Sequence, residues 1–186
     1  MSNRLSKIYT RTGDDGTTGL ANGERVDKSS IRIEVMGNLD ELNSLIGVIE
    51  ASDIPDGISG YLLNIQHRLF DIGGEIATPG NATNAPTSVE RLEELIETYN
   101  SDLPALKEFV LPGGSISASV CHLARSVCRR SERSLVELSH AEYINPESLK
   151  YINRLSDLLF VFARTLNQEK GGKEILWDSE RLKRSV

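Results

Sequence analysis

The stretch from residue 109 to residue 138 constrains the fold most, because it encodes one long helix with two different faces. Its sequence is FVLPGGSISASVCHLARSVCRRSERSLVEL, and after residues 112–114 it contains neither proline nor glycine. Ser115 or Ser117 can cap a helix at this point. At about 100° per residue, one face is small and apolar and the opposite face is cationic. The apolar face holds Val120, Ala124, Val127, Ser131, Leu135 and Leu138, and the cationic face holds His122, Arg125, Arg129, Glu132 and Arg133.

Four arginines crowd this helix within nine residues: Arg125, Arg129, Arg130 and Arg133. Cations one helical turn apart repel by a few tenths of a kcal/mol per pair, and Glu132 offsets only one of them, so the sequence predicts a compensating anion. Two interpretations remain open. The arginines either form a solvated face with salt bridges to neighbouring helices, or they bind a polyphosphate, whose oxygens suit the guanidinium fork.

Composition limits the classes of function. The chain has 186 residues, which suit one domain with a sizeable core. A net charge of -6 and a pI near 5.2 argue against a general nucleic-acid or membrane-surface role, so the arginine cluster is expected to be a local site. With no apolar run of about 18 residues and no signal-peptide pattern, we expect a cytoplasmic protein. The two cysteines and three histidines show no zinc-type spacing.

The N-terminal stretch YTRTGDDGTTGLANGERVDKSS is polar and rich in glycine. Gly13, Gly16 and Gly19 recur every three residues between threonines and aspartates, a pattern that can turn backbone N–H groups and hydroxyls toward an anion. No Gly-Lys-Ser/Thr follows, so this is not a Walker A loop. A plain turn-rich N-terminus is the alternative interpretation.

The remaining chain is predicted to be helical. Ile31, Ile33 and Val35 alternate with charged residues, which favours a short extended segment or else the lead into a helix that Asn38 would cap. Further on, a Thr87–Glu90 capping box and an Asn145 cap open two more helices. The five expected helices cover residues 39–52, 62–78, a segment from 87, 115–138 and a segment from 145 that ends before Gly171.

The fold class expected from these segments is all-α: an up-and-down five-helix bundle with a short extended, Gly-rich nucleotide loop at the N-terminus. Residues 1–186 are expected to form a single domain, in which residues 1–30 are the loop region and residues 173–186 a C-terminal tail. The tail carries Trp177 and alternating charge, and it fits either a partner-contacting segment or a frayed end.

Four blocks, in this order and spacing, resemble the PduO-type ATP:cob(I)alamin adenosyltransferases. They are YTRTGDDGTTGL, LDELNSLIG, FVLPGGS with HLARSVCRRSER, and YINRLSDLLFVFAR, and they extend over residues 7–164. The resemblance implies a five-helix bundle that forms a homotrimer with active sites between adjacent subunits. It also implies that the protein transfers the 5′-deoxyadenosyl group of ATP to Co(I) of cob(I)alamin.

The resemblance also implies roles for individual residues. Arg129 would act on the leaving triphosphate, and Phe109 would lie on the corrinoid face, although Phe109 would also serve simply to pack the loop before the helix. Asp40 would pair with Arg125 across the subunit boundary, unless it only complements the dipole of its own helix. The implied ATP-binding residues are Thr10, Arg11, Thr12, Gly13, Thr18, Gly19, Lys28, Arg129, Arg130, Ser131, Glu132, Arg133 and Asn153.

Glu132 has two interpretations: it helps to hold the Mg²⁺ that accompanies ATP, or it is an intrahelical partner of an arginine. The chain departs from the family at two positions of the loop. Arg11 stands where the family usually has lysine, which keeps the charge. Asp15 stands where lysine is frequent, which reverses the charge and makes nucleotide affinity at the loop uncertain.

The implied chemistry suits these residues, because a Co(I) nucleophile attacking the 5′ carbon of ATP needs alignment and charge stabilisation rather than a general base. Reaching Co(I) is harder, and an apolar group such as Phe109 would keep an axial ligand from cobalt. A flavin-dependent reductase and a cobalamin-dependent enzyme are the expected partners. The rival hypothesis is a non-catalytic corrinoid or ATP carrier or sensor, and an RNA-binding helix is disfavoured by the acidic pI.

Overall fold

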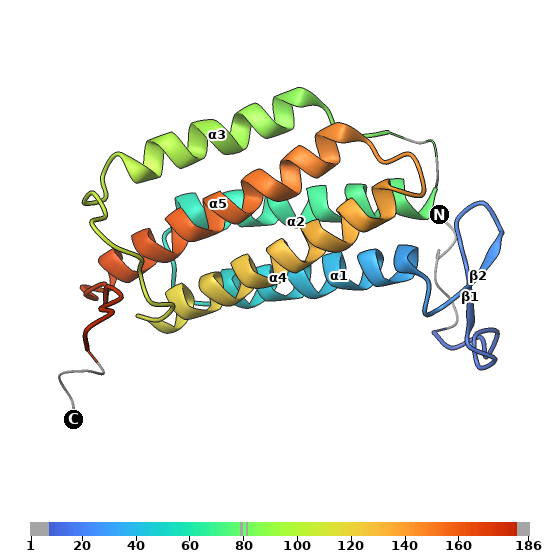
Figure 1. The fold of residues 1–186 in the computed structure, drawn as a ribbon, viewed down its shortest axis with the longest axis horizontal. Helices are drawn as coiled ribbons and strands as arrows, with labels where there is room; N and C mark the ends of the chain where they lie inside the picture. The colour runs from blue at the N-terminus through green and yellow to red at the C-terminus, as the bar shows by residue number, and fades with distance from the viewer. Residues whose placement is uncertain (1–7, 79, 81, 182–186) are drawn as a thin grey trace.

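The structure is a computed structural model that describes residues 8–78, 80 and 82–181. Five helices account for most of it: α1 (Ile31–Glu50), α2 (Asp56–Ala77), α3 (Pro86–Asn100), α4 (Ile116–Ser139) and α5 (Pro146–Glu169). They lie alongside one another as a bundle, and a small two-stranded hairpin projects from one end (Figure 1). Strands β1 (Thr17–Gly19) and β2 (Arg25–Asp27) form this hairpin. The predicted all-α bundle is confirmed.

One hydrophobic core draws on all five helices, as their apolar stripes predict. Helix α1 packs on α2 and α4, and α5 packs on α4 and α3. The residues of α4 that face the core are small, including Ala124, Cys128 and Ser131, all fully buried, so α1 and α5 can approach it closely. Both cysteines are free and buried. No helix in the described part of the chain has the length and apolarity to cross a membrane.

Of the two interpretations of Ile31–Val35, the extended segment is wrong and the helical one is correct, because α1 begins at Ile31. Val35 is fully buried and continues the stripe of Leu39 and Leu42 at helical spacing, which outweighs the short alternation in the sequence. Asn38 therefore lies inside the helix rather than capping it. Its side-chain amide donates a hydrogen bond to Ser134 Oγ of α4, at 3.1 Å.

The predicted capping box at Thr87 is also wrong. The N-cap of α3 is Ala85, which has no side-chain cap, and Pro86 occupies the first turn, where its missing N–H costs nothing. The other two predicted caps are confirmed. Ser115 Oγ accepts a hydrogen bond from Ala118 N at 3.2 Å, and Asn145 Oδ1 accepts one from Glu147 N at 3.1 Å.

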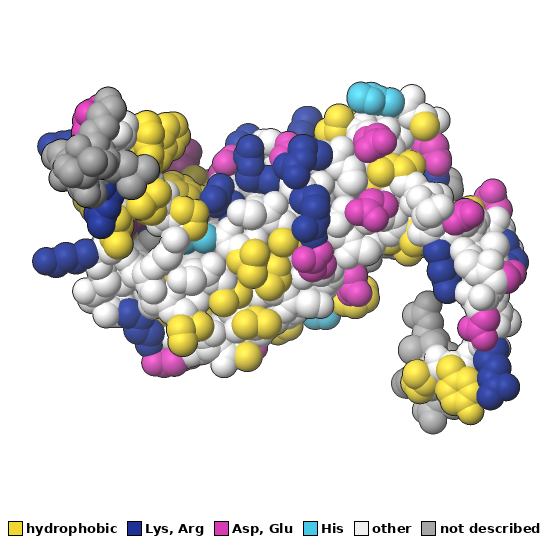
Figure 2. Space-filling model, turned by 60° about the horizontal axis from the view of Figure 1, so that its bottom comes forward, with side chains coloured by type: hydrophobic (Ala, Val, Ile, Leu, Met, Phe, Trp, Pro, Cys, Tyr) yellow, Lys and Arg dark blue, Asp and Glu magenta, His cyan; other side chains and the backbone are white. Residues whose placement is uncertain are grey.

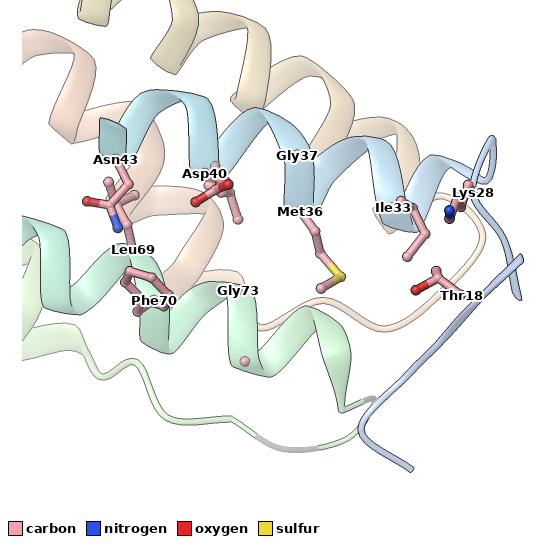
Figure 3. Close-up of a pocket in the computed structure, with 12 residues that line it drawn as sticks. Thr18, Lys28, Ile33, Met36, Gly37, Asp40, Asn43, Leu69, Phe70 and Gly73 are labelled. Carbon is pink, nitrogen blue, oxygen red and sulfur yellow. The ribbon is translucent and has the colours of Figure 1, made fainter. Parts of the chain in front are cut away.

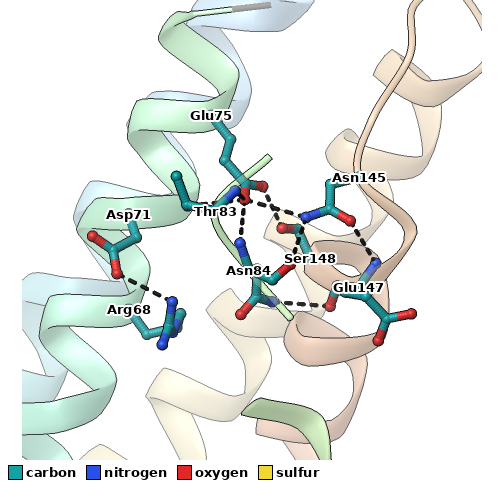
Figure 4. A network of polar contacts seen from close by, with 8 residues as sticks. All are labelled: Arg68, Asp71, Glu75, Thr83, Asn84, Asn145, Glu147 and Ser148. Carbon is teal, nitrogen blue, oxygen red and sulfur yellow. Dashed lines mark hydrogen bonds and ion pairs between the residues drawn. The ribbon is translucent and has the colours of Figure 1, made fainter. Parts of the chain in front are cut away.

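A buried carboxylate ties the end of α2 to the start of α5 (Figure 4). Glu75 Oε1 accepts hydrogen bonds from Thr83 Oγ1 (2.9 Å), from Asn84 N (2.6 Å) and from the side chain of Asn145 (3.2 Å). Its other oxygen accepts a hydrogen bond from Ser148 Oγ. One side chain of α2 thereby fixes the loop that leads to α3 and the first turn of α5.

The C-terminal tail lies against the segment that precedes α4, through residue 177. Leu111 N donates to Ile175 O at 2.8 Å, and Trp177 N donates to Phe109 O at 2.7 Å. Arg164 of α5 holds the tail from behind through an ion pair with Glu174, at 2.6 Å. The tail therefore fixes the backbone of the segment that carries Phe109.

Candidate active site

Four of the expected ATP-binding residues lie together where α4 and α5 reach the surface. Glu132 Oε1 accepts a hydrogen bond from Asn153 Nδ2 at 2.6 Å, which links the two helices. Arg133 Nη1 donates to Arg129 O at 3.0 Å, so the Arg133 side chain folds back along α4. Figure 2 shows Lys and Arg side chains gathered across the middle of one face, beside an apolar patch. We call Arg129, Glu132, Arg133 and Asn153 the arginine face.

Arg130 and Ser131 point elsewhere, although they belong to the same sequence block. Arg130 forms an ion pair with Glu41 of α1, and its Nε donates to Asn38 Oδ1 at 3.1 Å. The Ser131 hydroxyl is fully buried and donates to Asn38 O at 3.1 Å. The structure therefore shows these two residues joining α4 to α1, outside the arginine face.

Arg129 and Arg125 remain without a compensating anion. Within residues 8–78, 80 and 82–181, neither guanidinium has an ion pair or a hydrogen bond. Burial, and then the neighbouring charge of Arg129, lower the pKa of Arg125, whose Nε is completely enclosed. A half-buried cation without a partner is costly. This arrangement favours an anion supplied from outside the chain.

Phe109 stands at the edge of this uncompensated charge. Its side chain is 78% exposed, while its N–H donates to Glu108 Oε1 at 2.9 Å and its carbonyl is held by the tail. A depression of about 570 Å³ lies here, lined by Phe109, Arg125, Phe160 and their neighbours. An apolar side chain on a fixed backbone is thus presented to solvent beside a cation.

The Gly-rich loop is held by the hairpin rather than lying free. Arg25 of β2 donates hydrogen bonds to Thr12 O and to Thr17 Oγ1, and it lies 3.5 Å from Asp15. The Asp15 carboxylate also accepts from Thr17 N at 3.0 Å. Hydrogen bonds from the Thr17 backbone N–H and hydroxyl, with a smaller contribution from the charge of Arg25, lower the pKa of Asp15. The unusual aspartate therefore stabilises the loop that the resemblance assigns to ATP.

The predicted loop residues adopt special conformations. Arg11 has a left-handed backbone, with φ of 62°, and its guanidinium lies over the Tyr9 ring at 5.6 Å. Lys28 Nζ donates to Gly13 O at 2.7 Å, which closes the loop. A Cβ at Gly13 would lie 3.0 Å from Lys28 Nζ and 3.0 Å from the Thr17 carbonyl oxygen, so any larger residue there would have to displace the lysine or the loop backbone slightly.

A groove of about 640 Å³ runs between α1 and α2 from the hairpin (Figure 3). Thr18 and Lys28 lie at its hairpin end, and apolar side chains such as Met36 and Phe70 line it farther along. Asp40, an exposed residue of α1, also lines the groove. Among the described residues, the Asp40 carboxylate has neither an ion pair nor a hydrogen bond. Asp40 and Arg125 therefore each lack a partner in the part of the chain that the structure describes.

Sequence reasoning missed the hairpin and the clamp by Arg25. The signal was the Asn22-Gly23 dipeptide, a turn-former between two short strands, and Gly23 has φ of 87°. His122 was also misplaced: it is buried at 4% exposure and not on the charged surface. In the described part of the chain, no three His, Cys, Asp or Glu side chains cluster to hold a metal. Glu132 is the single carboxylate of the arginine face.

Comparison with known proteins places this geometry in a family. The model of the cobalamin adenosyltransferase family matches residues 8–166. A cobalamin adenosyltransferase from Cupriavidus metallidurans is 53% identical over 182 residues, which cover 97% of this chain and 99% of that protein. A corrinoid adenosyltransferase from Bacillus subtilis is 46% identical, over 89% of each chain.

Solved structures agree. A phenylalanine-to-histidine variant of a PduO-type ATP:corrinoid adenosyltransferase from Lactobacillus reuteri, complexed with cobalamin and ATP, superposes with a TM-score of 0.88. It is 37% identical, and the match covers 93% of this chain and 97% of that one. An arginine-to-lysine variant of a PduO-type adenosyltransferase from the same organism, complexed with ATP, has a TM-score of 0.86. It is 38% identical, and the match covers 92% of this chain and 100% of that one. The resemblance seen in the sequence is confirmed: the chain belongs to the PduO-type cobalamin adenosyltransferase family.

Proposed function

We propose that this protein transfers the 5′-deoxyadenosyl group of ATP to Co(I) of a corrinoid and releases triphosphate. The observation that carries the proposal is the pair of uncompensated cations, Arg125 and Arg129, beside the exposed ring of Phe109. A polyphosphate leaving group supplies the anion that Arg129 lacks. A flat, largely apolar corrin supplies the surface that Phe109 lacks.

The Lactobacillus reuteri structures support the two principal assignments. In that protein, the replaced phenylalanine and the replaced arginine are twenty positions apart. Phe109 and Arg129 have the same spacing here. The phenylalanine variant was complexed with cobalamin and ATP, and the arginine variant with ATP. We assign Phe109 to the corrinoid and Arg129 to ATP.

We assign the Gly-rich loop and the arginine face to opposite parts of one ATP molecule. Arg129, Arg133 and Asn153 would contact the phosphates from the bundle, and the loop with Lys28 would close over the nucleotide. Magnesium travels with ATP and usually needs only one or two protein carboxylates, so Glu132 fits that role. When bound, Mg²⁺ would neutralise charge on the triphosphate as it leaves. Arg130 and Ser131 would act indirectly, by holding α4 against α1.

The reaction needs Co(I), which is a strong nucleophile but difficult to form while an axial ligand remains on cobalt. Phe109 would occupy the axial position and exclude water and the displaced base. Arg129 would hold the triphosphate so that the 5′ carbon lies in line with cobalt. A flavin-dependent reductase would supply the electron, and a cobalamin-dependent enzyme would use the product. A cytoplasmic location suits this chemistry because strong reductants are available there.

We further propose a homotrimer in which each active site lies between two subunits. Asp40 borders the groove between α1 and α2, and Arg125 lines the depression beside Phe109. Neither has a partner among the described residues of its own chain, and their charges are complementary. The Gly-rich loop of one subunit would then reach the arginine face of the next.

Turnover tests the proposal. Protein, ATP, Mg²⁺ and chemically reduced cob(I)alamin should form the light-sensitive Co–C bond and release triphosphate. Arg129→Ala should lower kcat by about 10² or more, because a donor to the leaving group is lost. Arg129→Lys should recover little, since the fork is lost.

The matched control is Arg91→Ala, which removes an exposed arginine that pairs with Glu94 on α3. This variant should turn over like the wild type. Binding of ATP and cobalamin without any Co–C bond formation would instead identify a carrier or sensor. Wild-type activity in both Arg129 variants would remove Arg129 from the site.

A further inference from the structure

His122 of α4 is a buried histidine with no hydrogen bond to its ring. It is 4% exposed, and among the described residues neither ring nitrogen has a hydrogen-bond partner. Nδ1 is completely enclosed. The ring packs against Phe160 with centroids 6.1 Å apart and planes at 58°. A buried polar side chain without partners requires an explanation, because leaving such a group unsatisfied costs about 1–3 kcal/mol.

His122 lines a cavity of about 200 Å³ that lies immediately behind the Phe109 segment. One wall is the backbone from Val110 to Gly114, and another is α5 at Ala163 and Asn167. The tail closes the cavity with Glu174 and Ile175. Val110 also lines the depression beside Phe109, so the two hollows are neighbours. A space of this size accepts a group of several heavy atoms, not a whole ligand.

The charges around the cavity keep His122 neutral. Burial, and then the positive charge of Arg125, lower its pKa, while Glu174 acts weakly in the opposite direction. Arg164 and Glu174 face each other as an ion pair, and Lys173 lies at the same wall. A neutral imidazole carries one N–H, and a bare acceptor is tolerated without a partner better than a donor. We therefore assign the proton to Nε2, because Nδ1 is completely enclosed and has no acceptor among the described residues.

We propose that this cavity receives one carboxamide arm of the corrinoid and that His122 Nε2–H donates a hydrogen bond to the carbonyl oxygen of the arm. The inference rests on the proposed function, since it takes the ligand at Phe109 to be a corrinoid. The periphery of a corrin carries amide-terminated arms, which are neutral, a few heavy atoms long, and both accept and donate hydrogen bonds. Glu174 and the carbonyls of the Val110–Gly114 segment offer acceptors for the arm's NH₂. His122 is thus a residue that determines corrinoid specificity.

Two substitutions separate the hydrogen bond from packing. His122→Phe keeps a ring against Phe160 but removes the donor, and His122→Gln keeps a donor. Affinity for cob(II)alamin should fall about tenfold in the phenylalanine variant, as expected for one buried hydrogen bond, and should partly return in the glutamine variant. The KM for ATP should stay unchanged in both. His67→Phe, at an exposed position on α2, is the matched control and should bind like the wild type.

Corrinoids with one arm hydrolysed to a carboxylate identify the contact directly. For each single-arm derivative, the measured quantity is its affinity divided by the affinity of cobalamin for the same protein. Replacing His122 should change this ratio for one isomer, the one whose altered arm enters the cavity. The ratios of the other isomers should be the same in wild type and variant. Equal ratios for every isomer in wild type and both variants would overturn the inference. If the phenylalanine variant does not fold, the same series measured with wild type and His122→Gln still tests the contact.

A small anion is the competing occupant, because Arg125 and Lys173 are near. Weaker inhibition by inorganic triphosphate in His122→Phe, with unchanged corrinoid affinity, would assign the cavity to the anion and overturn the inference. Wild-type turnover is measured in parallel. An active wild type with unaffected His122 variants refutes only the arm contact, whereas an inactive wild type refutes the proposed function.

Discussion

Replacing Glu75 by glutamine tests whether one buried carboxylate holds the frame beneath the Gly-rich loop. The side chain is 6% exposed and accepts five hydrogen bonds. The next residues of α2 support the N-terminal region, since Arg32 donates to Ile76 O and Ala21 N donates to Ala77 O at 3.2 Å. Glutamine keeps the shape of the side chain and its Oε1 acceptor, so the substitution removes the charge and makes the Ser148 hydroxyl accept a hydrogen bond from the amide where it donated one to Oε2.

The expected loss in the free energy of unfolding follows from the five hydrogen bonds that Glu75 accepts. A hydrogen bond to a charged acceptor contributes about 1 kcal/mol more than a neutral one, so five bonds lose about 5 kcal/mol in total. Burying a neutral amide costs less free energy than burying a carboxylate, and this difference offsets part of the loss. We expect Glu75→Gln to lower the free energy of unfolding by about 2 kcal/mol at pH 7. Glu75→Ala should cost about 4 kcal/mol or more, because it leaves buried donors unpaired.

The pH dependence has a definite sign. Burial alone would raise the pKa of Glu75, but the hydrogen bonds from Ser148 and from the backbone of Asn84 and Thr83 outweigh it and lower the pKa below its usual 4.5. Its stabilisation is therefore complete above the unfolded pKa and is lost as the pH falls through the lower, folded pKa. The gap between wild type and Glu75→Gln should shrink below about pH 4.

Urea unfolding at pH 7 and at pH 3.5, with equal protein concentrations, measures this gap. Glu93→Gln is the matched control, because Glu93 makes an exposed ion pair with Arg154 at 3.0 Å, and it should cost less than about 1 kcal/mol. Equal stability of Glu75→Gln and wild type at pH 7, or a gap that widens in acid, would refute the reasoning.

Substitutions at four further positions test the site. Phe109→Ala should sharply reduce assays that start from cob(II)alamin and a flavin reductant but affect pre-reduced cob(I)alamin much less, and equal losses would make Phe109 general packing. Single alanine substitutions of Asp40 and Arg125 should each impair turnover, with the double variant less impaired than additivity predicts; additive losses would indicate independent charges. Arg25→Ala should raise the KM for ATP several-fold and expose the loop to protease, with little change in kcat; unchanged KM and protection would exclude the clamp.

The helices and the arginine face were largely predictable, because long apolar stripes at helical spacing leave few alternatives. The stripe of α4 and the cap at Ser115 both follow from local rules. The start of α1 was not predictable by the same means. The alternation from Ile31 to Val35 is too short to distinguish strand from helix, and only packing against α2 and α4 decides it.

His122 shows why a helical wheel is insufficient for the site. It shares a face with Arg129, yet residues 110–114, α5 and the tail cover that face near the start of α4 and leave it open farther along. Arg130 belongs to the same sequence block as Arg129 but pairs with Glu41 of α1, a residue far away in sequence that a helical wheel of α4 does not include. Periodicity describes one element, whereas exposure depends on the others. The proposed pairing of Asp40 with Arg125 involves a second subunit, so the periodicity of one chain carries no signal for it.

Transfer of the adenosyl group itself is the central claim, and ATP labelled with ¹³C at the 5′ carbon tests it most directly. The account predicts that, with cob(I)alamin, the label appears in a Co–C bond, and that one intact triphosphate is released for each bond formed. Phosphate and ADP should not accumulate. Release of phosphate without a cobalt-bound label, or unchanged ATP beside bound corrinoid, would contradict the account.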